Sequence, residues 1–160
     1  DEDEVIVVPA FAGLGVPYWD SSSRGAIFGL TRDSNSKHLV KAALQSIAFQ
    51  AKDIVEAIQE DTKVKMESLN VDGGASMNDY LMQFQSDILD IPIDRPEIFE
   101  STALGAAFLA GLESKIWTID DLKKIRKTSK LFSPKLSLEE RTSLYAKWKD
   151  AVSRTFNWHK

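Results

Sequence analysis

The sequence predicts an α/β fold. Short segments rich in β-branched residues alternate with longer segments whose apolar residues recur at helical spacing, in the order strand, strand, helix, strand, helix, strand, helix. The chain has 160 residues, of which 43% are hydrophobic and 28% are charged. It is therefore long enough for one domain with a core, and its composition is that of a soluble globular protein.

Two strands are expected near the start of the chain. Residues 5–8 form a β-branched run closed by Pro9, and residues 25–30 form a second run bounded by glycines. The loop between them, residues 10–20, is rich in glycine, proline and large aromatic side chains. Such a loop lies against the core or against a partner domain, and the sequence leaves both alternatives open.

A long helix follows, capped by Ser34, Asn35 or Ser36 and ending near Gln59. We expect its apolar stripe to face the core and its charged side to face water. The stripe consists of Val40, Ala43, Leu44, Ile47, Ala51, Ile54, Val55 and Ile58, and the polar side of Lys41, Gln45, Lys52 and Glu56.

The middle of the chain alternates again. Residues 69–71 form a short strand that ends in two glycines, and a helix begins between Ser76 and Asn78. Residues 91–93 form a brief extended segment, and residues 101–111 form a helix of small residues. Such a helix gains little from propensity where its glycines lie, so we expect it to approach a neighbouring element closely.

The last third of the chain is predicted to be helical. A short polar helix covers residues 120–126, and residues 127–130 are the most linker-like stretch. Ser137 and Glu140 have capping-box spacing at the start of the final helix. Its expected buried side contains Leu138, Leu144 or Tyr145, Trp148, Val152 and Phe156.

Composition excludes several classes of function. The net charge is -4 with acids and bases intermixed, so no nucleic-acid footprint is visible. The absence of cysteine excludes disulfides and thiolate chemistry, and it fits a reducing compartment such as the cytoplasm. With only two histidines as well, the composition argues against a zinc site. No apolar run approaches the roughly 20 residues that span a bilayer. The chain begins with four acidic residues and no methionine, so we expect it to be a piece of a longer protein.

The strongest chemical candidate is the turn at residues 72–78, where a strand runs into two glycines and then a helix. Glycines let a flat ligand touch the backbone, and a helix N-terminus favours phosphates. Asn78 offers amide donors and an acceptor to a base or a ribose. The plain alternative is an ordinary strand-to-helix turn, and the turn matches neither the Walker nor the Rossmann pattern.

No other residue has a clear catalytic pattern. Asp72 ends a strand and Asp20 follows two aromatic residues, but aspartate is also a routine turn residue. His38 and His159 have no visible serine, cysteine or aspartate partners, so triad chemistry is not supported.

Several stretches in order resemble one family. Residues 8–20 (VPAFAGLGVPYWD), 24–32 (RGAIFGLTR), 71–78 (VDGGASMN), 81–89 (LMQFQSDIL), 95–97 (RPE) and 102–107 (TALGAA) are similar to glycerol kinases. These enzymes belong to the FGGY family of carbohydrate kinases, whose second signature residues 25–45 fit. The resemblance is dense over residues 5–117 and thin to Trp148.

The resemblance implies two actin-like (ribonuclease H-like) domains, with ATP and the polyol in the cleft between them. Residues 1–160 would be the C-terminal nucleotide-binding domain, N-terminally truncated, without its first strands and without the whole N-terminal domain. Gly74 and Asn78 match nucleotide-binding positions, and Gly73 and Ala75 would line the same wall. The implied activity is transfer of the ATP γ-phosphate to glycerol, giving glycerol 3-phosphate.

The same resemblance places the catalytic base, the polyol ligands and the Mg²⁺ ligands outside this chain, so no catalytic residue is assigned and the chain alone is expected to be inactive. The expected partners are ATP or ADP, glycerol, the N-terminal domain and a further copy of the chain. Three alternatives remain: another FGGY sugar kinase such as a xylulokinase or gluconokinase, a non-enzymatic actin-like ATP-binding module, and a helical interaction domain.

Overall fold

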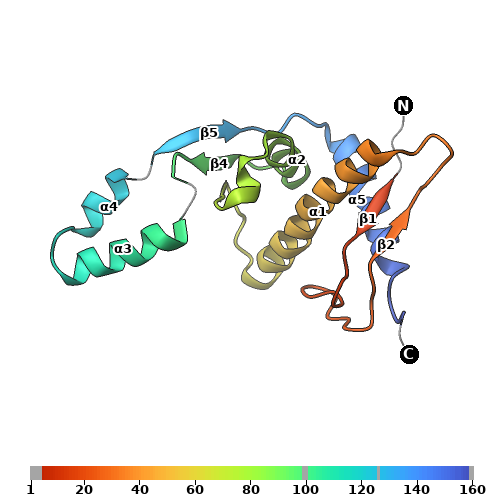
Figure 1. The fold of residues 1–160 in the computed structure, drawn as a ribbon, viewed down its shortest axis with the longest axis horizontal. Coiled ribbons are helices and arrows are strands. Elements are labelled where there is room, and N and C mark those ends of the chain that lie inside the picture. The colour runs from red at the N-terminus through yellow and green to blue at the C-terminus, as the bar shows by residue number, and fades with distance from the viewer. Residues whose placement is uncertain (1–4, 99–100, 126, 159–160) are drawn as a thin grey trace.

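The computed structural model describes residues 5–98, 101–125 and 127–158 (Figure 1). Its elements follow the predicted order, with one additional strand near the end. They are β1 (Ile6–Val8), β2 (Ala26–Phe28), α1 (Ser36–Thr62), β3 (Leu69–Asn70), a 3-10 helix η1 (Gly74–Met77), α2 (Asp79–Leu89), β4 (Ile93–Pro96), α3 (Ser101–Glu113), α4 (Ile119–Ile125), β5 (Thr128–Phe132) and α5 (Leu138–Ser153).

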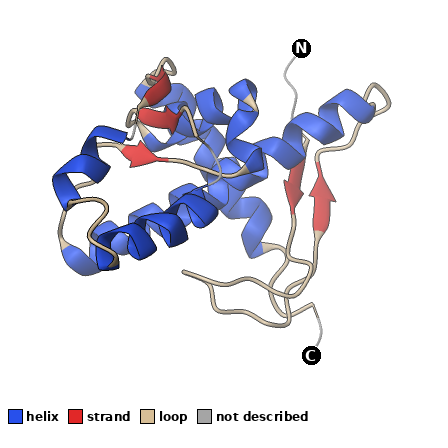
Figure 2. Ribbon diagram, turned by 60° about the vertical axis from the view of Figure 1, so that its left-hand side comes forward, coloured by secondary structure: helices blue, strands red, loops and turns tan. Residues whose placement is uncertain are grey.

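The strands form two small sheets (Figure 2). β1 and β2 pair antiparallel, with Ile6 opposite Phe28. The other sheet has the order β3-β4-β5, in which β3 is parallel and β5 antiparallel to β4. The short strand β3 is therefore an edge of its sheet, and the chain runs from it directly into the glycine turn.

The core lies where α1, α2, α5 and β1 meet. Phe49 of α1 stacks on Trp148 of α5 with ring centroids 5.3 Å apart, and it meets Phe84 of α2 edge-on at the same distance. Trp148 is completely buried. Aromatic side chains contribute large buried areas, so these three rings hold the three helices together.

The predicted orientation of α1 is wrong for most of its length. The side that faces the core carries Ala42, Ser46, Ala48, Phe49, Asp53 and Val55. The expected apolar stripe is largely on the surface, where Val40, Ile47, Ile54 and Ile58 are exposed. Small residues let α2 and β1 come close to the helix, and the buried Asp53 has hydrogen-bond partners, so this more polar side packs well.

The stretch expected to be a linker is part of a strand. Thr128–Phe132 forms β5, which pairs with β4, although only its last residue is buried. Its polar sequence concealed it, because an edge strand needs few apolar side chains.

The final helix begins as predicted, with a complete capping box between Ser137 and Glu140. Its buried side contains Trp148, Ala151 and Val152, whereas Leu138 is exposed.

The aromatic loop, residues 10–20, is partly packed against the core and partly exposed. Tyr18 packs against Phe156 with ring centroids 5.7 Å apart, and Leu14 is buried. Phe11 and Trp19 are highly exposed. The loop therefore contacts the core at some aromatic positions and leaves others on the surface.

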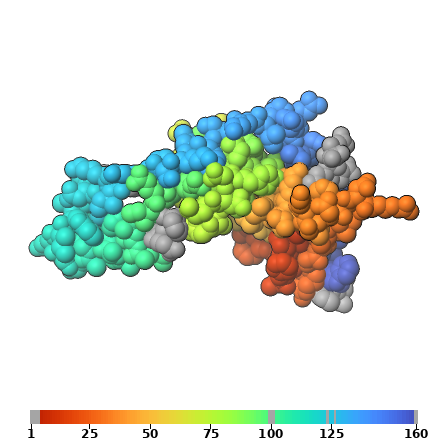
Figure 3. Space-filling model, turned by 45° about the horizontal axis from the view of Figure 1, so that its top comes forward, coloured from red at the N-terminus to blue at the C-terminus, as the bar shows by residue number. Residues whose placement is uncertain are grey.

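Helices α3 and α4 lie side by side at one end of the molecule, joined to the rest through β4 and β5 (Figures 1 and 3). A Cβ atom at Gly111 of α3 would overlap the ring of Trp117 in the loop that follows, whereas one at Gly105 would meet no atom within 4 Å, so the glycines do not bring α3 against another element among the described residues. Elsewhere α3 exposes apolar residues, including Leu109.

Candidate functional site

The glycine turn forms one continuous surface between β3 and α2. Gly73 begins it with φ 75° and ψ 173°, a backbone conformation that L side chains rarely adopt. Gly74, Ala75, Ser76 and Met77 form the short helix η1 that follows. The predicted α-helical start at residues 76–78 is therefore corrected: a 3-10 turn comes first, and α2 begins at Asp79.

The outer side of this turn is open. Gly74, Ala75 and Asn78 are exposed, and Gly73 is partly exposed. A Cβ atom built on Gly74 would meet no atom within 4 Å, and the same is true of Gly73. Among the described residues, nothing packs against the space that a Gly74 side chain would occupy.

Asn78 joins the turn to the helix. Its side-chain oxygen accepts a hydrogen bond from the Leu81 amide at 3.0 Å, which caps α2. Its backbone N–H donates to the Ala75 carbonyl at 3.1 Å. The Asn78 oxygen therefore has a structural role, and the amide N–H groups are the part of the side chain suited to a ligand.

The inner side of the turn is held by buried polar groups. Ser76 is buried, and its hydroxyl donates to the Gly73 carbonyl at 2.7 Å. Arg95, at the end of β4, donates to the Ser76 carbonyl at 3.0 Å and to Asp79 Oδ1 at 2.8 Å. Lys130 of β5 contacts the other Asp79 oxygen at 2.6 Å.

These contacts change the acidity of Asp79. The hydrogen bonds from Lys130 and then from Arg95 hold the pKa of the Asp79 carboxyl below its usual range. Asp79 is the first residue of α2, where a negative charge also interacts favourably with the helix dipole. The carboxylate thus stays ionised and keeps the turn, the helix and the sheet connected.

The two candidate carboxylates, Asp72 and Asp20, have different surroundings. Asp72 is exposed beside the turn. Asp20 accepts hydrogen bonds from Ser22, Ser23 and the Asn157 amide, which hold the pKa of its carboxyl well below the usual range. It is therefore a loop-stabilising residue.

The two histidines differ in what the structure describes of them. His38 Nδ1 accepts from the Asn35 amide in a capping box, while His159 lies outside the described residues. Across residues 5–98, 101–125 and 127–158, no group of three or more His, Cys, Asp or Glu is arranged to hold a metal ion.

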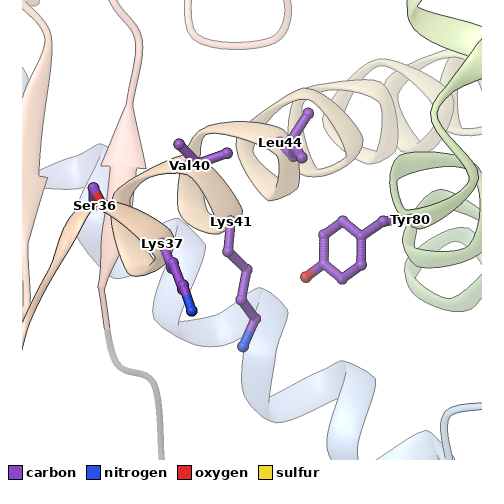
Figure 4. A pocket seen from close by; sticks show the side chains of 6 residues that line it. All are labelled: Ser36, Lys37, Val40, Lys41, Leu44 and Tyr80. Carbon is purple, nitrogen blue, oxygen red and sulfur yellow. The ribbon is translucent and has the colours of Figure 1, made fainter.

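A concavity of about 400 Å³ lies near the first turns of α1 (Figure 4). Val40, Lys41 and Leu44 line it from α1, and the Tyr80 ring closes it from α2. None of the four predicted nucleotide-binding residues lines it. Its surface is mostly apolar, and Val40 and Leu44 are the members of the α1 stripe that line it, so it lies between α1 and Tyr80 of α2 rather than at the glycine turn.

Ser76, Asp79, Arg95 and Lys130 are the site residues that the sequence analysis did not single out. Arg95 acts on a backbone carbonyl 19 positions earlier, and such a contact leaves no local pattern. The only signal was that Arg95 falls within a stretch similar to other kinases.

The chain matches known proteins along almost its whole length. Residues 1–114 match the model of the FGGY family of carbohydrate kinases, C-terminal domain. A protein named glycerol kinase from Pediococcus pentosaceus is 53% identical over 97% of this chain. One from Thermoanaerobacter sp. is 50% identical over 99%. These alignments cover 31% and 32% of the two relatives, so the chain spans about a third of their length.

Solved structures give the same result. The crystal structure of Plasmodium falciparum glycerol kinase with ADP is 41% identical, with a TM-score of 0.86 over 96% of this chain and 31% of that one. A ligand-bound xylulose kinase from Lactobacillus acidophilus, at 23% identity and a TM-score of 0.76 over 96% of this chain and 32% of that one, shares the fold.

The α/β, actin-like fold expected from the sequence is confirmed by these structural neighbours. No helix within the described part of the chain is both long and apolar enough to cross a membrane. The match over residues 1–114 and the similarity to glycerol kinases agree with the motifs quoted from the sequence. The chain belongs to the FGGY family of carbohydrate kinases.

Proposed function

We propose that the protein containing this chain transfers the γ-phosphate of ATP to glycerol, giving glycerol 3-phosphate, and that the glycine turn lies against the adenosine. The open space in front of Gly74 carries this proposal, because the fold leaves that glycine free of any packing requirement. The similarity to proteins named glycerol kinase, one of them crystallised with ADP, supports the choice of nucleotide and acceptor.

In this proposal the chain binds and orients the nucleotide and performs no chemical step itself. The backbone of Gly73, Gly74 and Ala75 forms a flat wall, and Asn78 donates its amide hydrogens to the nucleotide. ATP supplies the transferred phosphoryl group. As the resemblance to glycerol kinases implies, the base, the polyol ligands and the Mg²⁺ ligands would lie in other parts of the protein, and phosphoryl transfer needs all of them together. The chain alone is therefore inactive.

We further propose that residues 1–160 are the C-terminal nucleotide-binding domain without its first strands. Three features support this: the exposed apolar stripe of α1, the exposed apolar residues of α3, and the edge position of β3. Exposed apolar surface of this extent marks a place where another part of a protein packs. The preceding part of the same polypeptide, which includes the N-terminal domain, is the occupant that the length of the relatives supports.

The nearest competing function is phosphorylation of a different sugar. The exposed aromatic residues Phe11 and Trp19 lie in a stretch that resembles glycerol kinases in particular, which favours glycerol over xylulose or gluconate. A cytoplasmic location fits both the use of ATP and the lack of cysteine. The exposed apolar surface also favours assembly into homo-oligomers.

The test is a Gly74→Val substitution in the full-length protein. We expect the ATP Kd to rise by tenfold or more, since each factor of ten corresponds to about 1.4 kcal/mol. The free energy of unfolding should stay near that of the wild type, because a Cβ atom at this position meets nothing within 4 Å and Gly74 does not have a positive φ. Calorimetry with ATP and with glycerol, together with urea unfolding, measures these quantities.

Gly73→Ala is the matched control. Its φ of 75° makes any side chain strained, so this variant should lose about 1 kcal/mol or more of stability. A folded Gly74→Val protein that binds ATP normally would exclude the nucleotide wall. Wild-type protein that phosphorylates xylulose or gluconate in preference to glycerol would exclude the proposed acceptor, and one that binds ATP without phosphorylating any polyol would favour a non-enzymatic module.

A further inference from the structure

Among the described residues, no atom lies within 4 Å of a Cβ atom built on Gly74, so the shape of the glycine turn depends on the contacts of its inner side. Two side-chain hydrogen bonds act there, beside the backbone bonds from Ser76 to Gly73 and from Asn78 to Ala75. The Ser76 hydroxyl closes the turn on itself through the Gly73 carbonyl, and Arg95 anchors the Ser76 carbonyl to the end of β4. Of these two, only the Arg95 bond connects the turn to another element.

Arg95 is unusual among the charged residues of the described chain, because it is only 8% exposed. One terminal nitrogen of its guanidinium makes both the bond to Ser76 and the bond to Asp79. The guanidinium carbon lies 5.3 Å from the centre of the Phe132 ring, which restricts it from the side of β5. A buried, charge-assisted donor with two acceptors fixes the distance between them.

The two acceptors are each next in sequence to a residue proposed to touch the nucleotide. Ser76 follows Gly74 and Ala75, and Asp79 follows Asn78. Holding Ser76 and Asp79 at fixed positions therefore fixes the backbone wall and the donor side chain relative to one another. Lys130 neutralises the second Asp79 oxygen, so the carboxylate is held from both sides.

We propose that Arg95 is a positioning residue for nucleotide binding: it sets the geometry of the glycine turn through Ser76 and Asp79 without touching the nucleotide. This inference rests on the proposed function. Supporting groups of this kind determine how precisely a binding site is formed, and misplacement of about 1 Å weakens it strongly.

The test uses the full-length protein with Arg95→Met and Arg95→Lys. Arg95→Met should raise the KM and Kd for ATP about tenfold while leaving the KM for glycerol unchanged. Arg95→Lys should recover part of the loss, because a single ammonium group carries enough donors for both acceptors. Initial rates at varied ATP and glycerol, with circular dichroism to confirm folding, provide the measurements.

Arg141→Met is the matched control. Arg141 is also a largely buried arginine, and it pairs with Asp90 at the opposite end of α2 at 2.7 Å. This change should lower stability without altering the KM for ATP. If Arg95→Met fails to fold, Asp79→Ala, which alters an exposed carboxylate, should raise the KM for ATP in the same selective way.

Two results would overturn the inference: a folded Arg95→Met protein with unchanged ATP affinity, or an equal loss of ATP affinity in Arg141→Met. A selective loss at Arg95 with partial recovery by lysine supports it. Failure of the proposed function is distinguishable, because the wild-type protein would then fail to phosphorylate glycerol.

Discussion

Asn78 combines two roles in one side chain, and substitutions separate them. Its oxygen caps α2 by accepting from Leu81, while its amide hydrogens are proposed to face the nucleotide. Serine is as good an N-cap as asparagine but has no amide group. We expect Asn78→Ser to keep the stability of the full-length protein and to weaken ATP binding by about 1 kcal/mol, the contribution of lost hydrogen bonds.

Asn78→Ala serves as the comparison, because it removes both roles. It should weaken ATP binding by a similar amount and also lower the free energy of unfolding by about 1 kcal/mol through loss of the cap. Urea unfolding and calorimetry of the two variants side by side give both numbers. Equal destabilisation in the two variants would contradict the capping role, and unchanged ATP affinity in both would contradict the binding role.

Single residues were predictable where their partners are close in sequence. The cap at Ser137 was predicted from Glu140 three positions later, and it has the complete geometry. Among the three residues offered for α1, Asn35 is the cap, and its partner His38 was not predicted. The glycine turn was also located correctly, because the glycines Gly73 and Gly74 interrupt a strand-to-helix transition. Its proposed contact with adenosine stays a prediction. Arg95 was not singled out because its role depends on a fold contact rather than on spacing.

At the scale of elements, α1 and α5 are joined by a buried carboxylate. Asp53 is 2% exposed and accepts from the Tyr145 hydroxyl at 2.5 Å and from Trp148 Nε1 at 2.8 Å. The Lys149 ammonium lies 3.6 Å away. Burial and then the hydrogen bond to Asp53 raise the pKa of the Tyr145 hydroxyl above its ordinary value.

This arrangement predicts alkaline sensitivity. An unfolded tyrosine loses its proton near pH 10, whereas folded Tyr145 holds its proton to higher pH. The stabilisation is therefore complete below about pH 10 and is lost as the pH rises through the higher folded pKa. Tyr18 and Glu56 also face this cluster, and burial likewise raises the pKa of Tyr18.

Tyr145→Phe should make the free energy of unfolding less dependent on pH between about 9 and 11, although the variant is less stable at neutral pH. Comparing the two proteins cancels the pH dependence that they have in common. Urea unfolding at a series of pH values measures the slopes. Parallel pH profiles for the two proteins would show that Tyr145 does not keep its proton in the folded state.

The elements were predictable in type and order but not always in orientation. The buried side of α1 contains the polar residues Ser46 and Asp53, so hydrophobic periodicity assigned the wrong side to the core. The reason is physical: Asp53 is acceptable inside only because Tyr145 and Trp148, more than 90 positions later, donate to it. Strand β5 was missed because pairing with β4, rather than burial, holds it.

At the scale of the whole molecule, the exposed stripe of α1 predicts self-association of the isolated chain. Val40, Ile47, Ile54 and Ile58 lie on one side of α1 and remain exposed among the described residues, by 44% to 61%. We expect the chain on its own to form dimers or larger assemblies, and Ile47→Lys combined with Ile54→Lys to shift it toward monomer. Light scattering at a series of concentrations measures the change.

In the full-length protein we expect the same double substitution to lower the free energy of unfolding, because it places two charges in the interface between α1 and the preceding part of the polypeptide. Leu131→Lys is the control, since Leu131 is similarly exposed but lies on β5, away from the stripe. Leu131→Lys should change neither the self-association of the isolated chain nor the stability of the full-length protein strongly. An isolated chain that is monomeric at high concentration, or a full-length protein unaffected by the double substitution, would contradict the proposed covering of α1.

The bonds to Asp53 also have a consequence for the order in which the molecule is made. Tyr145 and Trp148 follow Asp53 by 92 and 95 positions, and the Asn157 amide follows Asp20 by 137. During synthesis, α1 exists long before the helix that satisfies its buried carboxylate. Pairings between residues so far apart in sequence slow folding, because the entropy of closing a long loop is lost before the contact can form. The side of α1 that carries Asp53 thus stays exposed to water until α5 has been synthesised. The contact between the aromatic loop and Asn157 can form only after that, because Asn157 lies beyond α5 in the sequence.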